Sequence, residues 1–134
     1  MTINGTFTIK MTPEAPYDVE GGITLGRVRF DKTFVGGLTA QSVVQMTAAR
    51  TAIADSAGYV AVEKITGTVD GKVGSFVVLH TGIMNRGTQS LTITIVPDSG
   101  TDDLVGISGS MDIKVVDGVH HYTLHHELIA SRGD

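Results

Sequence analysis

Apolar and polar residues alternate with a period of two along much of this 134-residue chain. In residues 6–11, Phe, Ile and Met alternate with Thr and Lys, and the same alternation recurs in residues 91–95 and 111–115. Because successive side chains of a strand point to opposite faces, this pattern predicts strands with one buried and one solvated face. The many Val, Ile and Thr residues favour strands as well. The chain is therefore predicted to be all-β.

Short turn signals separate the predicted strands. Asp70-Gly71 lies between strands at residues 59–69 and 72–84, and Asp117-Gly118 lies between strands at residues 104–116 and 119–129. Such pairs suit two-residue hairpin loops, in which positive φ angles are required. Further strands are predicted at residues 23–30 and 38–47, which brings the count to about eight. The alanine-rich stretch after residue 47 is interpreted as a connection.

Sequential strands joined by short turns, without helical crossovers, pair in an antiparallel manner. We expect an eight-stranded antiparallel closed barrel, because closure removes exposed strand edges. A β-sandwich is the alternative. A single β-barrel domain over residues 1–134 is expected, since this length suits one core and no linker or repeat is visible.

Composition excludes several classes of function. Cysteine is absent, so disulfides, thiolate metal sites and thiol nucleophiles are excluded. The net charge is −4 and the basic residues are dispersed, which argues against nucleic acid as a partner. No apolar run reaches the roughly 20 residues of a membrane helix, and no secretory signal is recognisable, so no membrane partner and a cytoplasmic location are expected. No phosphate-binding loop precedes a helix, so no cofactor is expected.

The turn at residues 70–71 also sets the register of its hairpin. Counting back from this turn makes Glu63 and His80 diagonal neighbours on one face, with backbones roughly 7–8 Å apart. Tyr59 and Phe76 share that otherwise apolar face. In one interpretation, Glu63 and His80 line a pocket as acid–base or ligand-orienting groups. In the other, they form a satisfied buried pair with a structural role.

Histidines are concentrated near the end of the chain: His120, His121, His125 and His126. On a regular strand, His120, Tyr122 and His126 share the more apolar face and are candidate cavity residues, unless they sit at the rims or pack as structural groups. Histidines of one face are roughly 13 to 20 Å apart at the rise of a strand. Ligands of one zinc ion must each lie roughly 2 Å from it, so no metal site is predicted.

Several segments resemble a bacterial family catalogued as a domain of unknown function. The resemblance extends from about residue 6 to residue 128 and depends on these segments together: 58–63 (Gly-Tyr-Val-Ala-Val-Glu), 66–68, 70–72, 74–82, 96–101, 104–109, and His120, Tyr122 and Leu124. It implies an eight-stranded barrel similar to that of plant allene oxide cyclase. His126 departs from the resemblance, because an aromatic residue such as tyrosine is expected there.

The resembling family supplies no activity, so function is argued from fold analogy and from the candidate residues. Barrels of similar architecture include cyclases and dirigent-type proteins, which hold an apolar small molecule and direct its ring closure or coupling. The leading hypothesis is a small-molecule-binding barrel with a mostly apolar cavity, in which Tyr59, Glu63, His80 and Tyr122 supply polar contacts.

Two alternatives stay open. One is a cofactor-independent isomerase or cyclase that uses Glu63 and His80 as acid–base groups. The other is a ligand-free oligomeric structural protein. A homo-oligomer is expected by analogy with related barrels, and the sequence does not decide whether the protein is an enzyme.

Overall fold

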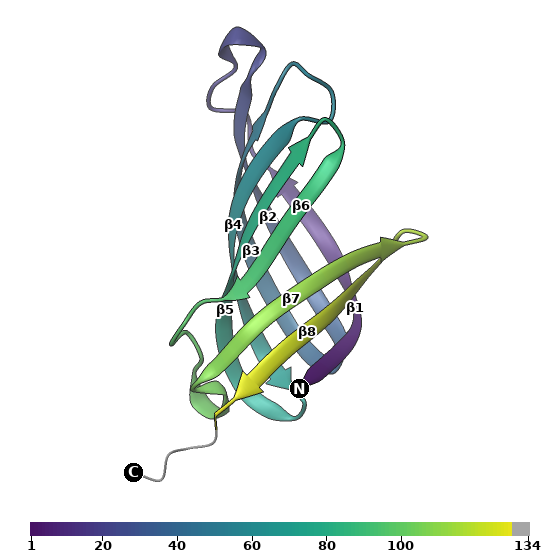
Figure 1. Cartoon of the computed structure of the whole chain (residues 1–134). Helices are drawn as coiled ribbons and strands as arrows, with labels where there is room; N and C mark the ends of the chain where they lie inside the picture. Colours follow the sequence, from purple (N-terminus) through teal and green to yellow (C-terminus); the bar gives the residue numbers. More distant parts are fainter. Residues whose placement is uncertain (130–134) are drawn as a thin grey trace.

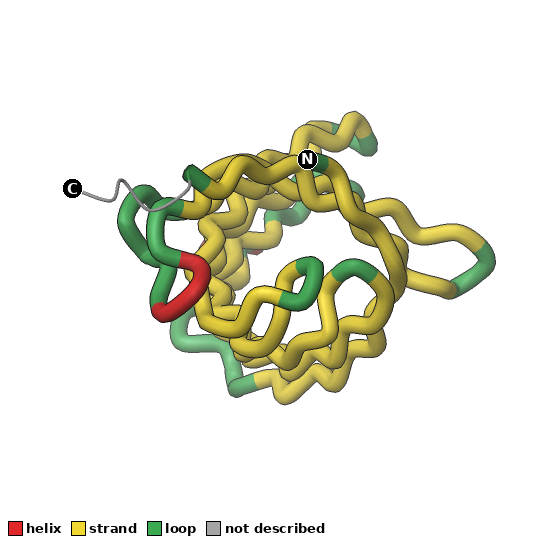
Figure 2. The backbone as a smooth tube through the Cα atoms, turned by 90° about the horizontal axis from the view of Figure 1, so that it is seen from below, coloured by secondary structure: helices red, strands yellow, loops and turns green. Residues whose placement is uncertain are grey.

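Eight antiparallel strands follow one another around a closed barrel, in which the last strand pairs with the first (Figures 1 and 2). The structure is a computed structural model that describes residues 1–129. The strands are β1 (Thr2–Pro13), β2 (Thr24–Gly36), β3 (Leu38–Arg50), β4 (Ala57–Val69), β5 (Lys72–Asn85), β6 (Thr88–Ile95), β7 (Ile107–Val116) and β8 (Val119–Leu128). The predicted all-β, eight-stranded antiparallel barrel is confirmed, and the sandwich alternative is wrong.

Helical structure is slight in the described part of the chain. It consists of two short 3₁₀ helices, η1 (Glu20–Gly22) and η2 (Asp102–Leu104). Within residues 1–129, no helix has the length and apolar character needed to cross a membrane.

Several strand limits differ from the predicted ones. β2 continues past residue 30 to Gly36, and β3 continues past residue 47 to Arg50. The added residues of β3 pair with the start of β4, so the ladder overrides the weak strand propensity of the two alanines. Residues 104–106 were predicted to be strand, but Leu104 ends η2 and β7 begins at Ile107.

The turn between β4 and β5 has the predicted geometry. Asp70 and Gly71 have φ angles of 49° and 83°, as a two-residue hairpin loop requires. The resulting register pairs Glu63 with Val78 and His80 with Ala61, as counted from the sequence. The turn therefore determines which residues of this hairpin face the interior.

The end of the barrel that contains the N-terminus, lower in Figure 1, is filled with buried side chains. Tyr122 anchors this filled end, because its hydroxyl accepts a hydrogen bond from the Leu38 N–H (2.8 Å) and donates one to the Val35 carbonyl (2.7 Å). The neighbouring Gly5 allows this close approach, since a Cβ there would collide with the Val35 carbonyl. The core of the filled end includes Phe34, Leu38, Ile65, Phe76, Val78, Ile107 and Leu124.

The opposite end is not covered. β6 and β7 pair only at Thr94 and Ser110, and the pairing of β1 with β8 ends at Phe7 and His120. Beyond these points the β7–β8 hairpin diverges from the other strands (Figure 1), so the inner face of β1–β6 loses its cover. We define the open end by six inward-facing side chains: Ile9, Met11, Met46, Tyr59, Leu91 and Val115.

Candidate functional site

Four buried polar side chains from neighbouring strands meet between the filled end and the open end. Lys32 comes from β2, Ser42 from β3, Glu63 from β4 and His80 from β5. Each lies at an inward position of its strand, as alternation dictates. A small barrel can fill its interior with apolar side chains alone, so four polar groups at one level form the candidate site.

Glu63 is the centre of this cluster and is completely buried (0% exposed). Its Oε1 lies 2.7 Å from His80 Nε2 and 3.3 Å from Lys32 Nζ. Its Oε2 accepts a hydrogen bond of 2.5 Å from the Ser42 hydroxyl. Both carboxylate oxygens are therefore occupied by side-chain partners.

The partners of Glu63 keep its carboxylate ionised. Burial by itself raises the pKa of Glu63, but the hydrogen bond from His80, the charge of Lys32 and the hydrogen bond from Ser42 together hold that pKa below its ordinary value. The Lys32 ammonium also lies 4.6 Å from the centroid of the Phe7 ring, where a cation–π contact adds to its stabilisation.

His80 uses one ring nitrogen within the cluster and leaves the other free. An ionised carboxylate only accepts hydrogen bonds, so Nε2 of His80 carries the proton that it shares with Glu63. Within residues 1–129, Nδ1 of His80 has no hydrogen-bond partner, yet it is not among the fully buried polar atoms. One nitrogen of the cluster thus has no partner among the described residues, on a side chain that is 6% exposed.

Tyr59 stands further toward the open end on the same inner face. Its ring packs against Gly82, where a Cβ would collide with the ring atoms. A hollow of about 110 Å³ lies beside it, with a wall that includes Met84 and Leu91. This volume is below the roughly 300–1,000 Å³ of sites for drug-sized ligands, so the hollow can hold only part of such a molecule. Burial raises the pKa of Tyr59, which keeps its phenol neutral.

The other predicted cavity residues lie elsewhere in the barrel. Phe76 and Tyr122 belong to the packed core of the filled end. His126 is also buried, with an Nδ1 that lacks a partner among the described residues, and burial is the main cause of its lowered pKa. His120 is half-buried, with its ring 5.1 Å from that of Phe7. The structure therefore brings Glu63 and His80 together, with Tyr59 nearby, and separates Phe76, Tyr122 and His126 from them.

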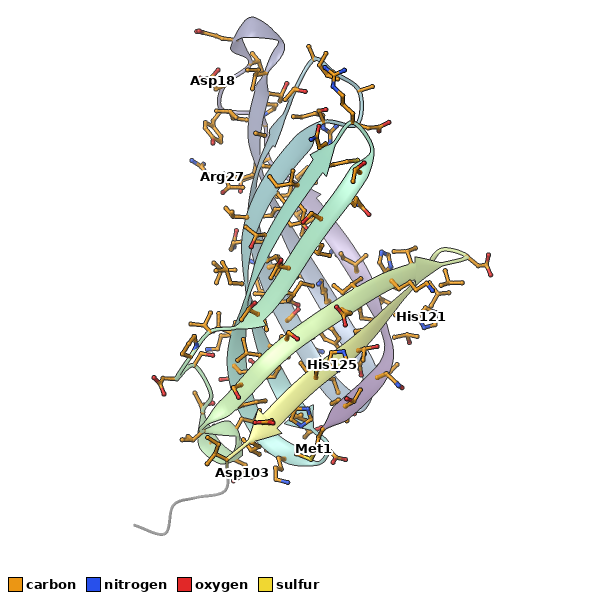
Figure 3. The ribbon with its side chains drawn as sticks, viewed as in Figure 1. Met1, Asp18, Arg27, Asp103, His121 and His125 are labelled. Carbon is orange, nitrogen blue, oxygen red and sulfur yellow. The ribbon has the colours of Figure 1, made fainter. Side chains whose placement is uncertain are left out.

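The remaining histidines, His121 and His125, are exposed on β8 (Figure 3). His125 Nε2 lies 2.9 Å from Asp112, and its Nδ1 lies 3.3 Å from the hydroxyl of Thr2. In the part of the chain that the structure describes, no three His, Asp or Glu side chains are grouped closely enough to hold a metal ion.

Sequence reasoning missed two members of the cluster, Lys32 and Ser42. The predicted strand ended at residue 30, which left Lys32 outside it. A signal was present, because Lys32 lies between Phe30 and Phe34 in an alternating run, where an apolar residue is expected. Ser42 gave a weaker signal, since small polar residues are common on either face of a strand.

Comparison with known proteins places the chain in a family. The family model described as "Protein of unknown function (DUF3224)" matches residues 3–126. A solved structure of a protein of unknown function from this family in Shewanella oneidensis MR-1 superposes with a TM-score of 0.91 at 42% sequence identity, covering 96% of this chain and 97% of that chain. Comparison with the curated proteins gives no match. With the family model spanning nearly the whole barrel and a relative sharing its fold, the chain belongs to the DUF3224 family.

Proposed function

We propose that the protein binds an amphipathic small molecule, with the apolar part at the open end and a polar group directed at His80. The observation that carries this proposal is the exposure of side chains on the inner face. Met11, Leu91 and Val115 are 58%, 45% and 58% exposed, although alternation places them inside the barrel. By contrast, the inward-facing residues of the filled end are buried.

Covering these side chains would supply the binding free energy. Removing apolar surface from water contributes roughly 25 cal/mol per Å². Nδ1 of His80 in the polar cluster beneath offers one directional contact, and its buried position strengthens that contact relative to one in water. An apolar surface with a few convergent polar groups is the usual composition of a small-molecule site. The 110 Å³ hollow beside Tyr59 is too small for a whole ligand, so the bound molecule would extend across the open end.

A cofactor-independent isomerase or cyclase is the second candidate. The 2.7 Å contact between Glu63 and His80 favours it, because a carboxylate that orients an imidazole is a frequent element of acid–base catalysis. Such an enzyme would use the same binding site. The third alternative, a ligand-free oligomeric protein, requires no binding at the open end.

A pair of leucines with similar exposure on opposite faces provides the test. Leu91 of β6 faces inward and is 45% exposed, whereas Leu79 of β5 faces outward and is 43% exposed. Binding of the neutral fluorescent dye Nile red would be titrated against the wild type, Leu91→Asn and Leu79→Asn. We expect Leu91→Asn to weaken binding about tenfold, which corresponds to about 1.4 kcal/mol of lost apolar contact. Leu79→Asn should leave binding unchanged.

The opposite pattern would contradict the proposal. Val60, Val62, Leu79 and Ile83 also expose apolar surface, on the outer faces of β4 and β5. If the dye responds to Leu79→Asn alone, the outer face is the binding surface. If the dye binds to none of the three proteins, the ligand-free alternative gains support. Light scattering of the same samples tests the expected homo-oligomer.

A further inference from the structure

We infer that Nδ1 of His80 receives the polar end of the ligand, and that the ligand belongs to the weakly acidic hydroxyl compounds, such as phenols and enols. The inference rests on the proposed function, because it specifies the chemistry of the same site. It assigns different roles to the two residues that sequence reasoning treated as an acid–base pair. His80 contacts the ligand, and Glu63 acts as a positioning residue.

The hydrogen bonds of Glu63 exclude it from direct contact with a ligand. Oε1 is shared by His80 and Lys32, and Oε2 is occupied by Ser42 at 2.5 Å. With a side chain that is 0% exposed, Glu63 offers no free oxygen to a molecule at the open end. A substrate proton cannot reach this carboxylate before one of its three partners leaves.

The same contacts select the tautomer of His80. Glu63 accepts the proton on Nε2, and in a neutral imidazole the other nitrogen is then a lone-pair acceptor. Lys32 lies 3.3 Å from the carboxylate and supplies its counter-charge. Glu63 therefore has a cationic partner besides His80. In the neutral imidazole, Nδ1 is an acceptor, and it suits a ligand that donates a hydrogen bond.

The strands around His80 indicate the side from which a ligand approaches. His80 pairs with Ala61 of β4 and with Ile93 of β6, so the wall is closed at its level. The filled end blocks the barrel below it. The next inward position of β5 is Gly82, where the ring of Tyr59 occupies the space that a side chain would take. A ligand that reaches Nδ1 from the open end therefore passes beside Tyr59.

The chemistry at this nitrogen is a simple proton exchange. The ligand O–H donates to Nδ1, and an acidic hydroxyl passes its proton completely. The O–H bond then breaks, its electron pair stays on the ligand oxygen, and a new N–H bond forms at Nδ1. The resulting imidazolium lies against the carboxylate of Glu63, which stabilises its charge. No oxidant, metal or further reactant is needed.

A matched pair of small molecules tests the inference. 4-Nitrophenol carries the hydroxyl, and 4-nitroanisole replaces its hydrogen with a methyl group while keeping the aromatic body. We expect the wild type to bind 4-nitrophenol about tenfold more tightly than 4-nitroanisole, as one hydrogen bond in a desolvated site can provide. His80→Phe should remove this preference while retaining the binding of 4-nitroanisole.

Nitrogen NMR of the unliganded protein tests the tautomer of His80, first in the wild type and then in two variants. In the neutral form of the ring, the ¹⁵N shifts of His80 should show a protonated Nε2 and an unprotonated Nδ1. In Ser42→Ala, which removes one partner of Glu63 but leaves its charge, the same tautomer should persist. In Glu63→Gln, the preference of His80 for the Nε2-protonated tautomer should weaken. This effect appears without any ligand, as expected when Glu63 acts by positioning His80.

The outcomes separate this inference from the proposed function. If both molecules bind equally and Leu91→Asn weakens both, the open end binds ligands but His80 does not select the hydroxyl, and the inference is wrong. If neither molecule binds, the proposed function fails together with it. A proton on Nδ1 in the wild type would overturn the assignment of the acceptor directly.

Discussion

Replacement of Glu63 by glutamine measures how strongly the buried cluster depends on its negative charge. The change keeps the size of the side chain, but it leaves the ammonium of Lys32 without a counter-charge. The two groups lie 3.3 Å apart, with side chains that are 5% and 0% exposed. At an effective dielectric constant of about 20, opposite charges at this distance attract by about 5 kcal/mol. Removing one partner of such a pair typically costs about 3–5 kcal/mol of stability.

Urea unfolding at neutral pH provides the assay. With a urea dependence of about 1–3 kcal/mol per molar, Glu63→Gln should lower the unfolding midpoint by about 2 M. The double variant Lys32→Met/Glu63→Gln should be more stable than Glu63→Gln, because it contains no uncompensated charge. Asp31→Asn is the matched control, since Asp31 pairs with Arg29 at 3.0 Å on the same strand but is exposed. It should shift the midpoint little.

Two results would refute this reasoning. In the first, Glu63→Gln unfolds within about 0.3 M urea of the wild type, which would show that the ion pair contributes little. In the second, the destabilisation of the double variant equals the sum of the losses that Lys32→Met and Glu63→Gln cause when each is made alone. Additivity of that kind would mean that Lys32 and Glu63 do not interact energetically, despite their contact.

Three further predictions concern single groups of the barrel. The pKa of Glu63 in the folded state is lowered from its ordinary value of 4.5. The stability that Glu63 contributes is therefore full above pH 4.5 and is lost as the pH falls through the folded pKa. Urea midpoints measured against pH should show this loss in the wild type and not in Glu63→Gln. Burial lowers the pKa of His126 from 6.5 in the folded state. As the pH drops below 6.5, the unfolded chain takes up the proton before the folded chain does, so the free energy of unfolding falls. His126→Phe should reduce this loss of stability between about pH 7 and 5. Tyr122→Phe should cost about 1–3 kcal/mol in the same assay, since it leaves the Leu38 N–H without its partner.

The central hairpin shows what local sequence can predict. Asp70-Gly71 specifies a two-residue loop, and the period of two then determines every inward position of β4 and β5. The predicted neighbours Glu63 and His80 are in direct contact at 2.7 Å because the ladder between these strands has no bulge. Contacts within one hairpin follow from its turn, since a shift of one residue would turn every side chain to the other face.

Contacts between strands of different hairpins could not be predicted from turns and alternation. Lys32 is 31 positions from Glu63 along the chain, and their contact depends on how far β2 and β3 extend. The open end was also unpredictable, because it results from the single pairing position between β6 and β7. That divergence follows from the closure of the whole barrel, so no local run of residues specifies it.

The position of the cluster bears on why the barrel contains it. Apolar side chains of similar volume often replace a buried ion pair at no loss of stability, and the packed filled end shows that this chain can build such a core. Stability alone therefore does not explain a fully buried Glu63 with three polar partners. The cluster leaves Nδ1 of His80 without a partner in the described residues, on a side chain that is 6% exposed. A charge network that orients one free nitrogen toward an uncovered apolar surface has the arrangement that ligand recognition needs. Ser42→Ala and Leu91→Asn should accordingly have different effects. Ser42→Ala removes a hydrogen bond of the Glu63 carboxylate, whereas Leu91→Asn weakens the binding of the ligand's apolar part.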